Sequence, residues 1–176
     1  NSVDFPHVFA VREEMRSWKF LQLDPQALRE PTRQEGSQDT ISHNGANLAS
    51  ALHRIKLEDP ALLKFISRRL NNILPQIIEV QVIDDKANKQ YLITVKNDDG
   101  REFTSRVLSE GTLRLLALCI MQYDHRHDGL ICFEEPENGI HPFRVAAMAD
   151  LLVDLSTDFR DFEGPLRQVI VNTHSP

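Results

Sequence analysis

The chain has 176 residues, of which 41% are hydrophobic and 26% charged, a composition that suits one globular domain with a sizeable core. Its formal net charge of −6 excludes a uniformly basic nucleic-acid-binding protein, although it does not exclude a basic patch on one face. The sequence has no apolar run long enough to span a membrane and no signal-peptide pattern, and Cys119 and Cys132 lie inside apolar runs. We therefore expect a protein of the reducing cytoplasm that has no membrane partner.

The first 42 residues carry weak structural signals. Residues 1–23 mix apolar and charged side chains without a clear period, and their apolar side chains are expected to cover an edge of the core. Residues 24–42 are rich in Pro, Gly, Gln, Ser and Thr, which predicts a mobile surface loop.

Residues 44–75 form a predicted helical segment. Apolar side chains recur there at helical spacing, and a second helix is expected to begin at Asp59-Pro60, a cap followed by a first-turn proline. Arg68 and Arg69 lie off its apolar face. A solvated surface is the simpler interpretation of these two arginines, and a phosphate contact is the alternative.

Residues 76–106 switch to a period of two. Apolar and polar side chains alternate in two runs, and the stretch 97–100 (Asn-Asp-Asp-Gly) is a strong turn signal. This pattern predicts antiparallel strands. We see no chemistry on this sheet.

Residues 107–176 have a different organisation. An apolar helix after Ser109 is followed by a short apolar strand at 130–133, a helix over about 142–155 and a last strand at 168–172. This alternation is typical of a parallel sheet with helical crossovers, so the predicted fold class is α/β.

Two adjacent acids, Glu134 and Glu135, follow the strand at 130–133 directly. Side chains alternate along a strand, so the two carboxylates should point in different directions. One can hold a hydrated Mg²⁺ while the other orients a water, a division that suits phosphoryl transfer. The alternative is a pair of solvated acids at the start of a loop, which the preceding apolar run and Pro136 make the weaker interpretation.

Two further groups are candidates for anion binding. Ser109, Gly111 and Thr112 stand at the mouth of the apolar helix, where free backbone N–H groups attract an anion, although an ordinary N-cap by Ser109 is the simpler interpretation. His174 follows the last strand, at the same sheet edge as the acids, and a histidine there can donate to a phosphate or fix a water. Residues 125–128 contain two histidines without metal-ligand spacing and predict a solvated loop.

Four motifs in one order resemble those of ABC-type ATPases. The stretch 108–112 (Leu-Ser-Glu-Gly-Thr) resembles the signature motif, 131–136 (Ile-Cys-Phe-Glu-Glu-Pro) the Walker B motif, 138–141 (Asn-Gly-Ile-His) the D-loop, and His174 the switch histidine of the H-loop. The amino-acid sequence of these motifs is most similar to that of the RecF/SMC-like and AAA15/AAA21-type ATPases, which are AbiEii- and OLD-related. The resemblance covers roughly residues 108–176.

That resemblance implies an ATP-hydrolysing head that uses ATP and Mg²⁺. It implies that Glu134 helps to hold Mg²⁺, that Glu135 is the catalytic base and that His174 contacts the γ-phosphate. The residues that would bind nucleotide are Ser109, Gly111, Thr112 and Asn138. ATP would be sandwiched between two heads, which makes a homodimer the expected partner state, with DNA as a further possible partner.

The sequence departs from the family pattern in several places. Glu134 replaces an Asp, Glu110 replaces a Gly and Thr112 replaces a Gln, which leaves the catalytic rate open. The phosphate-cradling Walker A motif, Gly-x-x-x-x-Gly-Lys-Ser/Thr, does not occur in these 176 residues. We therefore expect the C-terminal part of a P-loop ATPase domain, inactive until an upstream Walker A region completes it. The alternatives are a non-catalytic partner module of another ATPase and the nucleotide-binding subunit of a transporter.

Overall fold

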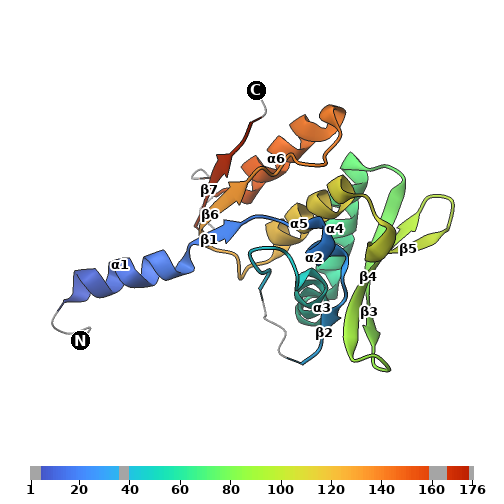
Figure 1. The fold of residues 1–176 in the computed structure, drawn as a ribbon, viewed down its shortest axis with the longest axis horizontal. Helices are drawn as coiled ribbons and strands as arrows, with labels where there is room; N and C mark the ends of the chain where they lie inside the picture. The colour runs from blue at the N-terminus through green and yellow to red at the C-terminus, as the bar shows by residue number, and fades with distance from the viewer. Residues whose placement is uncertain (1–4, 36–39, 159–165, 175–176) are drawn as a thin grey trace.

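Two β-sheets lie on either side of a central helix, α5 (Figure 1). The structure is a computed structural model that describes residues 5–35, 40–158 and 166–174. In chain order the elements are α1 (Pro6–Ser17), β1 (Lys19–Leu21), α2 (Pro25–Arg29), β2 (Thr32–Arg33), α3 (Leu48–Glu58), α4 (Pro60–Ile73), β3 (Ile77–Asp85), β4 (Gln90–Asn97), β5 (Glu102–Thr104), η1 (Ser105–Val107), α5 (Glu110–Tyr123), β6 (Gly129–Glu134), η2 (Pro142–Arg144), α6 (Val145–Leu155) and β7 (Arg167–Asn172).

The first sheet is parallel, with strand order β1-β6-β7. Its register places Leu21 beside Phe133 and Phe133 beside Val171, so the three strands end at one edge. The predicted α/β fold with a parallel sheet is thereby confirmed. The sequence pattern did not reveal β1, because three residues are too few to show a period.

One face of the parallel sheet is covered and the other is open. Ile131 and Phe133 are buried in the same core cluster as the apolar residues of α5 and α6. On the opposite face, Phe20, Cys132 and Ile170 stand side by side across the strands, with Phe20 64% and Ile170 57% exposed. Parallel sheets are normally covered on both faces, so this open face is unusual.

The second sheet is antiparallel and built on the β3–β4 hairpin, as predicted for residues 76–106. Gly100 turns the chain after β4 with φ +83°, and β5 then pairs back onto β4. α3 and α4 pack on this sheet, and Asp59 ends α3 and caps α4 by accepting from the Ala61 N–H at 2.9 Å. The predicted start of the second helix at Asp59-Pro60 is therefore confirmed.

Residues 24–42 contain more structure than the predicted surface loop. Asp24 caps the short helix α2, and Leu28 on that helix is buried. Thr32 then pairs with Tyr91, which adds β2 to the antiparallel sheet. These elements are too short to generate a period, although the Asp-Pro cap signal at the start of α2 was present in the sequence. Within this range, residues 36–39 lie outside the described part of the chain, and mobility stays a prediction.

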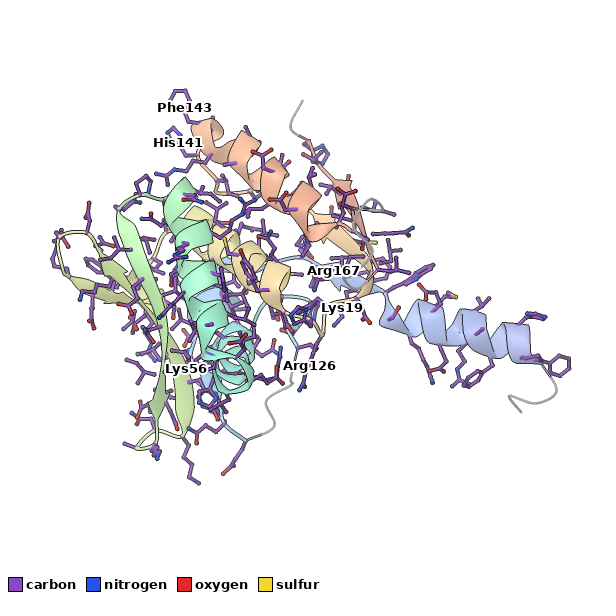
Figure 2. The ribbon with its side chains drawn as sticks, turned by 180° about the vertical axis from the view of Figure 1, so that it is seen from behind. Lys19, Lys56, Arg126, His141, Phe143 and Arg167 are labelled. Atoms are coloured by element: carbon purple, nitrogen blue, oxygen red, sulfur yellow. The ribbon has the colours of Figure 1, made fainter. Side chains whose placement is uncertain are left out.

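The helix α1 projects from the body of the molecule (Figures 1 and 2). It has no buried residue, so the expectation that the start of the chain covers an edge of the core is wrong for this helix. Of the residues expected to cover that edge, Leu23 is buried, whereas Met15, Trp18 and Phe20 are exposed, so the expectation is met only in part. The exposed apolar side chains on and beside α1 are Phe5, Val8, Phe9, Val11 and Met15. An isolated helix of about 12 residues is only marginally stable in water, so we expect α1 to pack against a partner.

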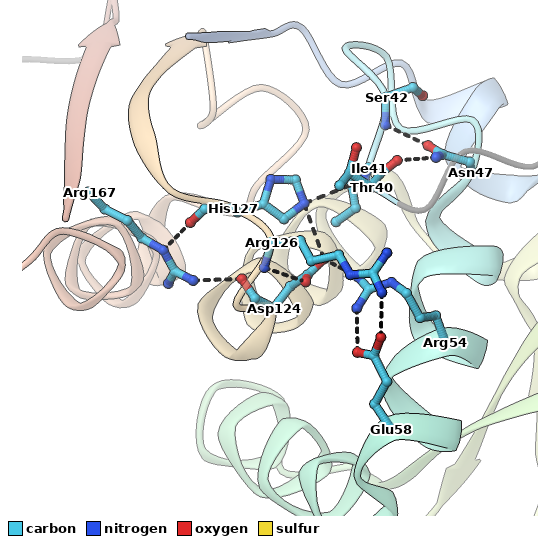
Figure 3. Close-up of polar contacts among 10 residues, drawn as sticks. All are labelled: Thr40, Ile41, Ser42, Asn47, Arg54, Glu58, Asp124, Arg126, His127 and Arg167. Atoms are coloured by element: carbon cyan, nitrogen blue, oxygen red, sulfur yellow. Dashed lines mark hydrogen bonds and ion pairs between the residues drawn. The ribbon is translucent and has the colours of Figure 1, made fainter. Parts of the chain in front are cut away.

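A buried polar network joins α3 to β7 through the connection between α5 and β6 (Figure 3). Asp124 and His127, between α5 and β6, are both fully buried. The predicted solvated loop at 125–128 is therefore wrong for His127, whereas the other three residues of that stretch are exposed. Arg54 of α3 lies 2.6 Å from the Asp124 carboxylate, and Arg167 of β7 donates to the Asp124 carbonyl at 2.6 Å. Burial alone would raise the pKa of Asp124, but hydrogen bonds from His127, the Arg126 N–H and Arg54 lower it to about 2.

Candidate functional site

The acid pair lies where the three parallel strands end. Glu134 is the last residue of β6 and stands in register with Asn172, whose Nδ2 donates to Glu134 Oε1 at 2.9 Å. Gln22 follows the neighbouring strand β1 and lines a pocket together with Glu134 and Glu135. The carboxyl edge of the sheet therefore gathers polar side chains from all three strands, which is where ligands bind in open α/β sheets.

Glu135 is held in an uncommon backbone conformation. Its φ is +44°, in the left-handed region that favours glycine. Its N–H donates to the Asn172 carbonyl at 2.8 Å, which ties this conformation to the end of β7. Asn138 Nδ2 donates to Glu135 Oε2 at 2.6 Å, and His174 Nε2 lies 3.4 Å from Glu135 Oε1. Three residues predicted for the site, Glu135, Asn138 and His174, are therefore in contact.

Sequence reasoning assigned no role to Glu137, which contacts the segment after β7. Its Oε1 accepts from the Thr173 hydroxyl at 2.5 Å and from the His174 N–H at 3.1 Å. The chain following β7 is thus attached to the turn that follows β6. No local sequence pattern indicates this contact, because it joins residues 36 and 37 positions apart.

The residues at the start of α5 form hydrogen bonds with one another. Ser109 Oγ accepts from the Thr112 N–H at 3.2 Å and lies 2.8 Å from Thr112 Oγ1, so Ser109 is an N-cap, as the simpler interpretation held. Gly111 is buried, and a Cβ added to it would lie 2.5 Å from the Gly139 carbonyl oxygen. This glycine therefore allows α5 to approach the turn after β6. Phosphate binding by Ser109, Gly111 and Thr112 stays a prediction.

Glu110, which replaces a glycine of the signature motif, has its charge paired. Arg114 Nη2 donates to Glu110 Oε1 at 2.9 Å, and Arg114 Nε donates to the same oxygen at 3.2 Å. The Glu110 side chain also lies against Gly139, where an added Cβ would come within 2.5 Å of Glu110 Cγ and Cδ. This salt bridge offsets part of the negative charge of Glu110 at the start of α5.

A pocket of about 300 Å³ opens beside the acid pair. The residues that line this pocket include Gln22, His43, Arg114, Glu134, Glu135 and Asn138. His43 reaches this edge because the Gln22 N–H donates to its carbonyl at 2.8 Å, and Arg114 reaches it from α5. His174 contacts Glu135 but does not line this pocket, and neither does Ser109. Gln22, His43 and Arg114 come together through long-range packing, which leaves no local signal in the sequence.

The donor set suits Mg²⁺ shared with a nucleotide. Magnesium is typically bound by one or two carboxylates together with substrate phosphates and water. Glu134 offers an exposed carboxylate at the sheet edge, and the described residues include no group of three or more His, Cys, Asp or Glu that could hold a metal by themselves. The acids therefore fit the metal corner of such a site, while the sequence lacks the glycine-rich phosphate cradle.

No helix within the described ranges has the length and apolar character needed to cross a membrane.

Comparison with known proteins assigns this arrangement to a family. The sequence profile of AAA_21, described as "AAA domain, putative AbiEii toxin, Type IV TA system", matches residues 3–176. No curated protein matched the chain.

Two solved structures are similar to it. One is an Smc head domain with a coiled coil and joint from Pyrococcus yayanosii, with 19% identity and a TM-score of 0.46 over 69% of this chain and 23% of that chain. The other is an Smc head domain with an extended coiled coil, bound to the C-terminal domain of ScpA, from Pyrococcus furiosus, with 14% identity and a TM-score of 0.47 over 71% of this chain and 33% of that chain. The chain thus spans a third or less of the length of these structures. Because the profile match covers nearly all of its sequence, the chain belongs to the AAA_21 family of AAA-type ATPase domains.

Proposed function

We propose that this chain is the catalytic-acid part of an ATP-hydrolysing head that closes on ATP together with a second head. The contact of Glu135 with Asn138 and His174 at the carboxyl edge of the parallel sheet carries this proposal. In this proposal, the attacking water and the terminal phosphate meet beside the carboxylate, the amide and the imidazole of these three residues. Phosphoryl transfer needs positioning and charge neutralisation more than covalent chemistry, and these groups can supply both.

Each residue has a distinct role in this mechanism. Glu134 would hold a hydrated Mg²⁺, which when bound neutralises charge on the phosphates. Glu135 would orient the attacking water and accept its proton, while Asn138 holds the Glu135 carboxylate in place by its bond at 2.6 Å. His174, whose side chain is 81% exposed, would donate a hydrogen bond from its ring to the terminal phosphate.

The site is completed by regions that this chain does not contain. We propose that a Walker A region covers the open face of the parallel sheet and supplies the phosphate cradle, and that the α5 start of a second head contacts the same nucleotide through Ser109, Gly111 and Thr112. The exposed Phe20 and Ile170 support the first part, because a parallel sheet is stable when both faces are buried. The unpartnered helix α1 supports it as well.

Replacing Glu135 tests the catalytic assignment in the complete, Walker A-containing protein. Glu135→Gln keeps the size of the side chain but removes the base, so we expect ATP turnover to fall by about 10²–10⁴-fold while ATP binding is retained. Glu102→Gln, on an exposed strand of the antiparallel sheet, is the matched control and should leave turnover unchanged. Equal turnover in Glu135→Gln and wild type would contradict the assignment. ATPase activity in the purified 176-residue chain, lost on Glu135→Gln, would contradict the need for a Walker A region.

A non-catalytic partner module is the second candidate function. The absence of a Walker A motif from the sequence favours it, since a head without a phosphate cradle can regulate another ATPase. Turnover in the complete protein that is unaffected by Glu135→Gln, together with altered turnover of a partner ATPase, would select this reading. The third alternative, a transporter subunit, would require a membrane-embedded partner.

DNA maintenance or phage defence is the biological setting that we propose, with DNA as the polyanion recognised. A groove of about 460 Å³ between α4 and β3 is lined by three basic side chains, Lys56, Lys64 and Arg68, and by one acid, Glu79 (Lys56 is labelled in Figure 2). Arg69, by contrast, pairs with Asp154. The two arginines, which the sequence could not distinguish, therefore have different surroundings. Arg69 forms a salt bridge, and Arg68 lines the groove.

Charge reversal in this groove tests DNA binding. A fluorescent duplex oligonucleotide is titrated with the complete protein at several salt concentrations. Each phosphate contact contributes about 0.9 to the slope of log affinity against log salt, so Lys64→Glu with Arg68→Glu should weaken binding and flatten that slope by about two contacts. Lys86→Glu, in the exposed β3–β4 turn, is the control. An absence of binding by the wild-type protein at low salt would exclude this role.

A further inference from the structure

Three acids at the end of β6 and in the turn that follows it each contact one residue at the end of β7 or just after it. Glu134 accepts from the Asn172 side chain, Glu135 contacts the His174 ring, and Glu137 accepts from Thr173 and from the His174 main chain. The first two acids have roles in the proposed reaction. Glu137 has none, although among the described residues it is the acid that reaches the His174 backbone.

The geometry separates the two halves of His174. Its N–H is fixed to Glu137 Oε1 at 3.1 Å, while its side chain is 81% exposed. Thr173 donates to the same oxygen at 2.5 Å, and a short bond from a hydroxyl to a carboxylate is among the stronger hydrogen bonds in proteins. The main chain of residues 173–174 is therefore anchored just past the end of β7, and the exposed imidazole lies 3.4 Å from Glu135 Oε1.

Glu137 can act as an anchor because its own position is fixed. The Ile140 N–H donates to the Glu137 carbonyl at 2.9 Å, and the Asn138 N–H donates to the Glu135 carbonyl at 3.2 Å, which closes a tight turn. Pro136 is buried in this turn. The same turn therefore presents Glu135 and Glu137 as one unit, one carboxylate for the His174 ring and the other for its backbone.

We propose that Glu137 is a positioning residue that fixes the backbone of His174, so that the imidazole reaches the terminal phosphate without reordering of the chain after β7. This proposal rests on the proposed ATPase function. The anchor also sets the distance between the ring and Glu135, because both carboxylates belong to one turn. A histidine that is not held in this way would have to be ordered at every turnover, and small misplacements of catalytic groups reduce rates strongly.

Two substitutions at one position test the anchor in the complete protein. Glu137→Ala removes the acceptor, and we expect kcat to fall by about 10- to 100-fold with little change in the KM for ATP. Glu137→Gln keeps a side-chain oxygen that can accept from both donors and should recover most of the loss. Thr173→Val removes one of the two donors and should give a smaller loss. Glu102→Ala is the control for an exposed acid elsewhere.

A second readout does not depend on ATP. Amide hydrogen exchange at His174, followed by NMR in the nucleotide-free protein, should accelerate by at least about tenfold in Glu137→Ala and stay slow in Glu137→Gln, because exchange follows the opening of the hydrogen bond. Unchanged exchange in Glu137→Ala overturns the anchor. If Glu137→Ala exchanges faster at His174 but keeps the kcat of wild type, while Glu135→Gln is inactive, then Glu137 is not important for catalysis. If the wild-type protein does not hydrolyse ATP, the proposed function fails, and the exchange result alone decides whether Glu137 anchors His174.

Discussion

Two glycines from distant parts of the chain meet beside the acid pair. Gly111, in the first turn of α5, lies against the backbone of Gly139 and Ile140, so close that a methyl group would fall 2.5 Å from the Gly139 carbonyl oxygen. The start of α5 and the turn that holds Glu135 therefore pack as one unit. If two heads close on ATP as we propose, a shift of α5 would be passed directly to the turn that holds Glu135 in the same chain.

Gly111→Ala should destabilise the protein. Alanine favours a helix over glycine by about 1 kcal/mol, but the clash with backbone atoms forces a shift that costs about 1–3 kcal/mol, so we expect a net loss in urea unfolding. Gly100→Ala is the comparison. It sits at φ +83° with open space around it and should cost only the strain of the left-handed conformation, about 1–2 kcal/mol. A Gly111→Ala protein more stable than wild type by about 1 kcal/mol, the full helix-propensity gain, would show that the two segments can separate freely.

The residues of the site were predictable to different degrees. Glu135 and His174 each follow an apolar run, and parallel strands end at one edge, so their meeting could be expected from the sequence. Ser109 was a clear N-cap. Glu137, Gln22 and His43 could not be assigned, because their contacts join segments far apart in the chain and depend on the exact register of β1 and β7.

At the level of elements, the network around Asp124 fastens α3 to β7 across the α5–β6 connection. The pKa of His127 is lowered, chiefly by burial, with Asp124 opposing the shift. The folded protein therefore keeps this ring neutral where an unfolded chain would take up a proton, below a pH of about 6.5. Asp124, with its pKa of about 2, stays charged in the folded state where the unfolded chain would bind a proton, below a pH of about 4.

Both shifts predict the same direction of acid sensitivity. The free energy of unfolding should decline as the pH falls below about 6.5, and Asp124 should remove about 2–3 kcal/mol more as the pH falls from about 4 towards 2. Urea unfolding at a series of pH values measures this. His127→Asn should abolish the decline that begins near neutrality, whereas His125→Asn, at the exposed neighbouring position, should not. An identical pH profile for wild type and His127→Asn would contradict the assignment.

The elements missed by sequence reasoning are short or lack a partner. β1 and β2 have three and two residues, and their pairing partners lie 112 and about 60 positions away in the chain. α1 lacked a usable signal because its apolar residues do not face the described core. By contrast, α5 was apparent because its apolar residues surround it, and the β3–β4 hairpin was apparent because its period of two runs through eight or more residues.

For the whole molecule, the uncovered sheet face predicts that the same substitutions affect stability weakly in one form of the protein and strongly in another. Phe20→Ser and Ile170→Thr alter side chains that are exposed here, so each should change the stability of the 176-residue chain by no more than about 0.5 kcal/mol. In the complete protein, where we propose that this face is covered, each should cost about 1.5–3 kcal/mol. Thermal and urea unfolding of both forms would measure the difference.

Phe133→Ala serves as the control because Phe133 is buried already and should destabilise both forms by about 3–5 kcal/mol. If the exposed-face substitutions are as mild in the complete protein as in the shorter chain, the covering region lies elsewhere on the molecule.

The left-handed backbone of Glu135 sets folding and activity against each other. A glutamate at φ +44° holds strain of about 1–2 kcal/mol that glycine would not, and asparagine tolerates this conformation better as well. Selection for thermostability alone would therefore favour Gly or Asn at this position and discard the carboxylate that we propose as the base. If that proposal holds, an engineering campaign that ranks variants by melting temperature would move towards inactive variants, and it needs turnover as a second criterion at this residue.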